Sequence, residues 1–379
     1  MEYRQLGTDG PQIPVIGLGA WPIGGGMGAV DERNAIDTIH ASIDHGITLI
    51  DTAQYYRTSE AIIGRALQNG WRDRCFIATK VSGKYSRTDI RTAIENSLRA
   101  LKVDMVDLYQ IHSWDPQYPV EDSMDEMAKL QQEGKVRYLG VSNYNAEQMQ
   151  RALKTARFHS NQPRYNLFDR EIEAQDISFC EREGIGILAH SPLAKGLLAG
   201  KYTPDTTFPS DDERSNFPRF QGETFARYLK VADQLKQVAA DKGLTLVQLA
   251  IAWQLRLPAI TCVLVGAKSP QQVADYIPAV GVVFTPEELA RIETILQDAI
   301  KLRAFFNDDD VLRVQRRQGA FDFQQRRDAR RRILRIELGN NFIGEPADFP
   351  AAGHAVPRCI HAVEDVLGRG FAVEKCERL

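Results

Sequence analysis

The sequence predicts an α/β fold in which parallel strands close into a (β/α)8 barrel, preceded by a small β-hairpin. Short apolar segments alternate with amphipathic segments of helical spacing along residues 15–276. Eight such units fill about the ~250 residues of one barrel domain. Polar residues follow nearly every apolar segment, and in a barrel these strand ends meet at one mouth. An open doubly wound sheet is the alternative, but a six-strand order would leave the last two units unplaced.

The expected elements follow from the spacing of the apolar residues. Residues 3–6 and 12–14, with Asp9-Gly10 as the turn, predict a hairpin that caps one end of the barrel. Strands are expected at residues 15–18, 47–50, 75–79, 106–111, 136–141, 160–163, 185–189 and 261–265. Helices are expected at residues 34–45, 60–68, 89–101, 124–132, 146–156, 175–182, 225–240, 246–255, 270–276 and 286–297.

Composition indicates an ordinary globular protein of the cytoplasm. The chain has 379 residues, a net charge of −3 and 43% hydrophobic residues, so nucleic acid is not an expected partner. No apolar run reaches the ~20 residues that span a bilayer, and the amino end lacks a signal layout. The five cysteines lack disulfide or zinc-ligand spacing, so we expect reduced thiols and no metal site, with Cys75 and Cys262 in the core.

Four residues near consecutive strand ends form a coherent chemical set: Asp51, Tyr56, Lys80 and His112. A tyrosine is a weak acid with a pKa near ~10 unless a cation favours its ionised form, and Lys80 can supply that cation. Asp51 can keep Lys80 charged in a desolvated pocket, while His112 donates to a carbonyl oxygen. The set suits carbonyl reduction by a hydride from a cofactor.

Each of these residues also has a structural interpretation. Asp51 and Lys80 could form an ion pair without catalytic use, and His112 could be a hydrogen-bonded core residue. Their occurrence at successive strand ends favours function. The glycines at 24–26 and 28 lack the G-x-G-x-x-G spacing, so we expect a flexible loop near the mouth and not a Rossmann fingerprint.

Several ordered motifs resemble those of the aldo-keto reductase superfamily, and the resemblance runs from the amino end to about Ala299. The motifs are Asp51-Thr-Ala-Gln-Tyr-Tyr-Arg-Thr-Ser-Glu60, Ala78-Thr-Lys80, Asp107-Leu-Tyr-Gln-Ile-His112, Gly140-Val-Ser-Asn-Tyr144, the segment 191–201 and Gly266-Ala-Lys-Ser-Pro-Gln-Gln272. Residues 201–222 further resemble the bacterial inositol-operon and general-stress branch.

The resemblance implies Tyr56 as proton donor, Lys80 and Asp51 as its tuning pair, His112 as the carbonyl-orienting residue, and NADPH as cofactor. Lys268 favours NADPH over NADH, because a cation beside hydroxyl and amide donors suits a phosphate dianion. It could also be a solvated surface charge, and Asp212 could join Arg214 in a lid over the pyrophosphate. The implied cofactor residues are Trp21, Ser142, Asn143, Gln162, His190, Ser191, Pro192, Leu193, Gly196, Lys201, Arg214, Gly266, Lys268, Ser269, Gln272 and Asp275.

Three positions depart from the family pattern. Arg57 replaces a usual glycine, His190 replaces an aromatic that stacks on nicotinamide, and Tyr276 replaces an asparagine that reaches adenine. Cofactor affinity could therefore be below the family norm. Trp21 and Trp114 fall where the family lines its substrate pocket, or they pack under a loop.

The arginine-rich residues 301–379 follow an expected barrel domain over residues 1–300. Residues 315–336 could form a basic helix that contacts an acidic partner or RNA, the run could be disordered, or the extension could be the product of a frame error; we favour the last two. We expect a monomeric NADPH-dependent reductase of small aldehydes or reactive ketones. The alternatives are an NADPH-binding redox sensor with slow turnover and an inactive scaffold.

Overall fold

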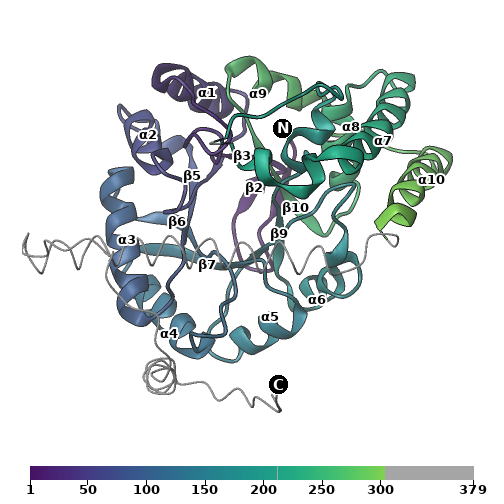
Figure 1. The fold of residues 1–379 in the computed structure, drawn as a ribbon. Helices are drawn as coiled ribbons and strands as arrows, with labels where there is room; N and C mark the ends of the chain where they lie inside the picture. Colours follow the sequence, from purple (N-terminus) through teal and green to yellow (C-terminus); the bar gives the residue numbers. More distant parts are fainter. Residues whose placement is uncertain (211, 304–379) are drawn as a thin grey trace, which may run out of the picture. The chain divides into compact units, whose positions relative to one another are not determined.

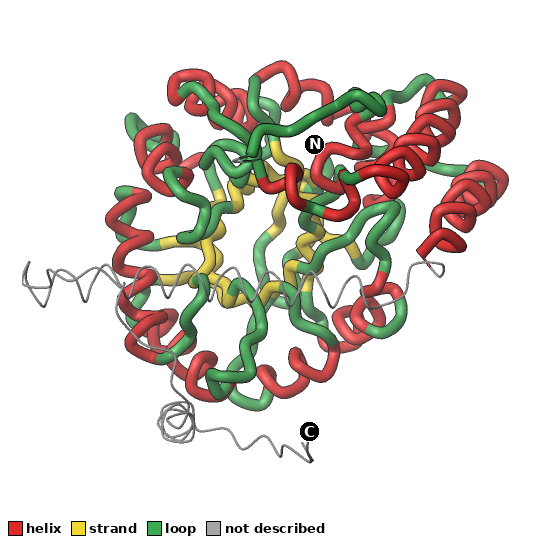
Figure 2. Tube along the Cα trace, viewed as in Figure 1, coloured by secondary structure: helices red, strands yellow, loops and turns green. Residues whose placement is uncertain are grey.

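The computed structural model describes residues 1–210 and 212–303. For residues 298–303 it describes the backbone only. Eight parallel strands form a closed barrel, in which each strand pairs with the next along the chain and the last pairs with the first. Figure 2 shows this ring of strands inside a ring of helices. The barrel strands are β3 (Ile16–Gly19), β4 (Leu49–Asp51), β5 (Phe76–Val81), β6 (Val106–Ile111), β7 (Val136–Ser142), β8 (Ser160–Gln162), β9 (Gly186–Ala189) and β10 (Ile260–Gly266). The predicted fold class is confirmed.

The helices cover the outside of the barrel (Figure 1). Polar side chains cap several of them: Asn145 and Thr245 each form a capping box with a glutamine three residues later. The helices are α1 (Glu32–Asp44), α2 (Ser59–Ala66), α3 (Arg87–Leu101), α4 (Val120–Gln132), α5 (Ala146–Leu153), α6 (Asp176–Glu183), α7 (Gly222–Asp241), α8 (Leu246–Leu255), α9 (Pro270–Tyr276) and α10 (Pro286–Arg303). The final helix extends beyond its expected end at residue 297.

The amino-terminal hairpin, β1 (Tyr3–Gln5) and β2 (Gln12–Pro14), packs on the barrel as predicted. Leu6 and Ile13 join a buried apolar cluster with the inward side chains of several barrel strands. Asp9 and Gly10 lie in the connection between the two strands as predicted, but its left-handed residue is Gly7, with φ 67°. Gly10 is still required, since a Cβ there would lie 2.1 Å from the Leu6 carbonyl oxygen.

Several predicted boundaries shift by one or two residues. Asp51, Lys80 and Ser142 lie inside the ends of their strands instead of just beyond them. Cys262 is fully buried as expected, whereas Cys75 precedes β5 and is only half-buried, with its thiol donating to the Trp71 carbonyl. The predictions for the extension concern residues from 304 onward, which lie outside the part of the chain that the structure describes. Among the described helices, none is long and apolar enough to cross a bilayer.

Candidate active site

The predicted catalytic side chains meet at the carboxyl end of the barrel. Asp51 ends β4 and Lys80 lies near the end of the adjacent β5, so their side chains point to one place. Lys80 Nζ lies 2.6 Å from Asp51 Oδ1 and donates to the Thr52 carbonyl at 2.8 Å. Lys80 Nζ also donates to the Tyr56 hydroxyl at 3.5 Å. The Tyr56 and His112 rings meet edge to face, with centroids 5.8 Å apart. The structure brings all four together.

Burial raises the pKa of the Tyr56 phenol above its ordinary value, although the Lys80 ammonium opposes this shift. The net direction is therefore opposite to the one expected from the cation alone. A raised pKa keeps the phenol protonated at neutral pH, so Tyr56 holds a proton that it can give away. Burial lowers the pKa of Lys80, but Asp51 and Tyr56 together outweigh burial and raise it, so Lys80 stays charged.

His112 is held as a neutral imidazole. Burial lowers its pKa to about 3, and the Lys80 ammonium adds to the shift. His112 Nδ1 lies 2.7 Å from the Ser82 hydroxyl. If that hydroxyl donates to Nδ1, the ring carries its proton on Nε2, where it is available to an acceptor in the mouth.

Three of the implied cofactor residues, Ser142, Asn143 and Gln162, lie at the ends of β7 and β8. Ser142 is buried, and its hydroxyl donates to the Gln162 carbonyl at 2.8 Å. Asn143 takes a left-handed conformation, with φ 57°, and its Nδ2 donates to the His112 carbonyl at 3.1 Å. Gln162 Nε2 donates to Asp51 Oδ2 at 2.8 Å. The structure therefore joins the expected cofactor side of the site directly to the catalytic side.

A cavity of about 740 Å³ opens beside these residues. Of the predicted residues, Lys80, Ser142, Asn143 and Ser269 are not among those that line it, and Ser269 caps α9 instead. The predicted residues that line the cavity are Trp21, Asp51, Tyr56, His112, Gln162, His190, Ser191, Pro192, Leu193, Gly196, Lys201, Arg214, Gly266, Lys268, Gln272 and Asp275. One cavity thus brings together residues from the first and the last of the sequence motifs.

One part of this cavity is rich in cations. Burial lowers the pKa of Lys268, and the positive charges of Arg214 and Lys201 lower it further. Asp212 offsets one charge, because it pairs with Arg214 and caps the 3-10 helix Glu213–Asn216. Lys268 Nζ donates to the Met27 carbonyl of the glycine-containing loop. Three cations around one wall suit phosphate groups.

The segment between β9 and α7 closes over the cavity through Glu213, a residue that we did not predict. Its carboxylate accepts from Trp21 Nε1 at 3.1 Å and lies 2.7 Å from Lys195 Nζ. The Trp21 ring meets the Tyr56 ring edge to face at 5.1 Å and is parallel to the exposed Tyr55 ring. Trp21 therefore contacts Tyr56 and the segment after β9 at once.

The three departures have defined contacts. Arg57 is exposed, takes a left-handed conformation and donates to the Gly25 carbonyl at 2.9 Å. His190 Nε2 lies 2.9 Å from Asn143 Oδ1, and burial lowers the pKa of His190 to about 3. The Tyr276 hydroxyl donates to the Gly266 carbonyl at 2.8 Å. Where the family pattern has an aromatic ring and an asparagine, His190 and Tyr276 thus form hydrogen bonds within the protein.

Sequence reasoning also missed Gln110, which points into the barrel from β6 and is fully buried. Its sequence signal is weak, because the polar residue lies within the strand and nothing in the spacing shows that its side chain points inward. Gly140 on the adjacent β7 makes room for it, because a Cβ at Gly140 would lie 3.0 Å from Gln110 Cγ. Trp114 is half-buried against Tyr144 and is not among the cavity-lining residues.

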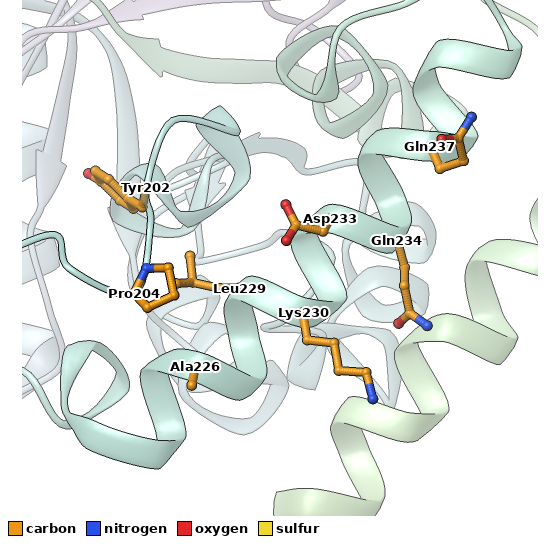
Figure 3. A pocket seen from close by; sticks show the side chains of 8 residues that line it. All are labelled: Tyr202, Pro204, Ala226, Leu229, Lys230, Asp233, Gln234 and Gln237. Atoms are coloured by element: carbon orange, nitrogen blue, oxygen red, sulfur yellow. The ribbon is translucent and has the colours of Figure 1, made fainter.

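A second hollow of about 490 Å³ lies along α7, beside Tyr202 and Pro204 (Figure 3). Its helical wall carries solvent-facing polar side chains, including Lys230 and Asp233. It shares only Tyr202 with the first cavity. The catalytic set belongs to the larger cavity.

Comparison with known proteins agrees with this geometry. The model of the Aldo/keto reductase family matches residues 15–297. Aldo-keto reductase YhdN of Bacillus subtilis (strain 168) is 39% identical over 314 residues, which cover 79% of this chain and 95% of that protein. The glycerol dehydrogenase AKR11B4 from Gluconobacter oxydans superposes with a TM-score of 0.70 at 38% identity, covering 78% of this chain and 94% of that one.

A further similar structure is the holo form of the aldo-keto reductase AKR11C1 from Bacillus halodurans, with a TM-score of 0.65 at 26% identity and coverage of 78% and 96%. The family match spans the barrel and stops before the arginine-rich extension. With these matches and the barrel-end site, the chain belongs to the aldo/keto reductase family and is an oxidoreductase.

Proposed function

We propose that this enzyme reduces aldehydes or reactive ketones to alcohols with NADPH, and that Tyr56 is the general acid. The observation that carries the proposal is the buried group in which Lys80 contacts both Asp51 and the Tyr56 hydroxyl. This group keeps the phenol protonated beside a fixed cation, as a proton donor to a developing alkoxide requires.

When bound, NADPH would supply the hydride for the carbonyl carbon. His112 would donate from Nε2 to the carbonyl oxygen and orient it towards Tyr56. As charge develops on that oxygen, Tyr56 would release its proton to it, and the Lys80 ammonium would stabilise the remaining phenolate. Asp51 would keep Lys80 charged and in place throughout.

The cavity fits a dinucleotide on two grounds. Its wall of Lys201, Arg214 and Lys268 suits phosphate oxygens, including a 2′-phosphate. Near the catalytic group, Gln162 and His190 offer polar atoms for a carboxamide. As part of this proposal, we assign the enzyme to the inositol-operon and general-stress branch, which residues 201–222 resemble.

The first test is NADPH oxidation with a panel of small aldehydes, comparing the parent enzyme with Tyr56→Phe. We expect the loss of the acid to lower kcat by about 10²–10⁴-fold while NADPH binding is retained. Tyr109→Phe is the matched control, because it removes a buried phenol whose hydroxyl donates to the Ile90 carbonyl. Since one relative is a glycerol dehydrogenase, glycerol oxidation with NADP+ belongs in the same assay.

Equal rates in parent and Tyr56→Phe would refute the acid role. A parent that binds NADPH but turns over no carbonyl would favour the redox sensor instead. If the chain binds a partner equally well before and after Tyr56→Phe, the inactive scaffold would be favoured.

The cofactor preference has a separate test in Lys268→Met. Removing one charged phosphate contact should weaken NADPH binding by about 10–100-fold, because such hydrogen bonds contribute roughly 1.5–3 kcal/mol. NADH binding, measured by the same fluorescence titration, should change much less. Equal weakening of both cofactors would show that Lys268 does not recognise the 2′-phosphate.

A further inference from the structure

Asp51 is held by more than Lys80. Its Oδ1 pairs with Lys80, whereas its Oδ2 accepts from Gln162 Nε2 at 2.8 Å and from Gln110 Nε2 at 3.3 Å. The two glutamines also contact each other, since Gln162 Nε2 lies 3.3 Å from Gln110 Oε1. Asp51, Gln110 and Gln162 are 2%, 0% and 1% exposed, so water does not compete for these bonds. The carboxylate thus belongs to an amide network that spans β4, β6 and β8.

Of the two glutamines in this network, Gln162 reaches the cavity, which Asp51 also lines. Ser142 Oγ and the Asn143 backbone N–H both donate to the Gln162 carbonyl, which fixes its main chain. Its side-chain Oε1 accepts from no residue among 1–210 and 212–303. Gln110 is not among the cavity-lining residues. A ligand amide could therefore donate to Gln162 Oε1 but would not touch Gln110.

Hydrogen bonds of this kind reinforce one another. An amide whose oxygen accepts a hydrogen bond becomes a better donor through its nitrogen, most of all in a dry interior. Stronger donation to Oδ2 withdraws negative charge from the Asp51 carboxylate. Asp51 then binds Lys80 less tightly and raises the pKa of Tyr56 less.

We propose that Gln110 and Gln162 are positioning residues that form an amide bridge, through which a carboxamide bound in the cavity adjusts the charge on Asp51 and the proton release of Tyr56. The bridge rests on the proposed function, because it takes the nicotinamide carboxamide as its ligand. Besides Asp51, the charged and titratable groups that face Tyr56 are Lys80, Glu213 and His112. Lys80 is the neighbour of Gln110 across the paired strands, but the Gln110 side chain forms its hydrogen bonds with Asp51 and Gln162.

The test measures how well the enzyme distinguishes NADP+ from its 3-acetylpyridine analogue, in which a methyl group replaces the carboxamide NH2. Fluorescence titration gives the dissociation constants of both ligands for the parent and for Gln110→Met. We expect the parent to bind NADP+ more tightly, and Gln110→Met to reduce this preference by about 3–10-fold, the coupling range of interacting neighbours. A residue with only a structural role would weaken both ligands equally.

The pH profile gives a second readout. Loss of the Gln110 bond leaves more charge on Asp51, so the pKa of Tyr56 should rise further and the alkaline limb of kcat/KM should move upward by about 0.5–1 pH unit. Gln254→Met is the matched control, because Gln254 is equally buried but donates to the Ala250 and Pro192 carbonyls and not to Asp51. It should change neither the ligand preference nor the alkaline limb.

An unchanged ligand preference in Gln110→Met would overturn the bridge while leaving the proposed function intact. A downward shift of the alkaline limb would overturn it as well, because the sign would be wrong. A parent that binds neither dinucleotide would overturn the bridge and the cofactor assignment together.

Discussion

The two ends of the barrel interior are built from the same strands but have opposite chemistry. At the amino end, Leu49, Ala78, Leu108 and Leu188 form an apolar layer that the hairpin covers. Two residues further along each strand, in the same order, come Asp51, Lys80, Gln110 and His190. Because residues i and i+2 of a strand face the same side, each polar side chain lies directly above an apolar one.

This layering shows how the barrel can bury an ion pair. The apolar layer excludes water from below, so the Lys80–Asp51 pair depends on the hydrogen bonds that Gln110 and Gln162 donate to Asp51 and on the one that Lys80 donates to the Thr52 carbonyl. A buried charge without such partners would be costly. Substitutions at the two layers should therefore have different consequences, with activity affected at one end and stability alone at the other.

The largest effect should come from Lys80→Met, which breaks the polar layer. It leaves the Asp51 carboxylate buried without its cation, so we expect a loss of about 3–5 kcal/mol in the free energy of unfolding, together with loss of activity. Urea denaturation at neutral pH measures the stability change. In the parent, the pKa of Lys80 is raised, so its contribution is full below the unfolded value of about 10.4 and is lost only as pH rises through the folded value.

The control for this change is the double variant Asp51→Leu with Lys80→Met. Replacing both partners by apolar groups removes the uncompensated charge, so stability should recover while activity stays lost. If the double variant is no more stable than Lys80→Met alone, lost packing and not the unpaired carboxylate accounts for the effect.

A loss in stability alone is expected for Leu188→Ala, which opens the apolar layer. Deleting a fully buried leucine costs about 2–5 kcal/mol, depending on how far the site relaxes. The residual folded enzyme should keep its kcat and its NADPH affinity at low temperature. A large fall in kcat without loss of stability would show that this layer also positions the catalytic residues above it.

The sequence predicts the polar layer only in part, for a physical reason. Asp51, Lys80 and His190 stand out because each follows an apolar run. Gln110 does not, because both faces of a parallel barrel strand are buried and period-two alternation is lost. Nothing in the strand Val106–Ile111 therefore marks which side chains point inward.

Contacts between distant loops are harder to predict. The bond from Trp21 to Glu213 joins residues 192 positions apart, and it depends on how the segment after β9 folds back over the cavity. The hairpin turn illustrates the local limit, since Asp9-Gly10 is a strong turn signal but Gly7 takes the left-handed conformation. Strand order was predictable, because consecutive parallel strands joined by helical crossovers are usually neighbours, which leaves few arrangements.

The smallest expected effect comes from the amino end of the barrel, which also holds a partly buried charge. The Arg4 guanidinium donates to the carbonyl oxygens of Leu255, Leu257 and Ile260, whereas the cation at the other end depends on a carboxylate. Arg4→Met should lower the free energy of unfolding by about 1–3 kcal/mol and leave kcat unchanged, since carbonyls at the end of α8 lose a charged donor.

Glu2→Gln is the matched control, because Glu2 pairs with Arg4 at 3.1 Å on an exposed surface. Such pairs contribute about 0–1 kcal/mol, so this change should be close to neutral in the same urea experiment. If Glu2→Gln destabilises as much as Arg4→Met, the amino end would also depend on an ion pair. If only Arg4→Met does, backbone carbonyls suffice to hold the Arg4 cation at the amino end, whereas the Lys80 cation at the other end is held by a carboxylate.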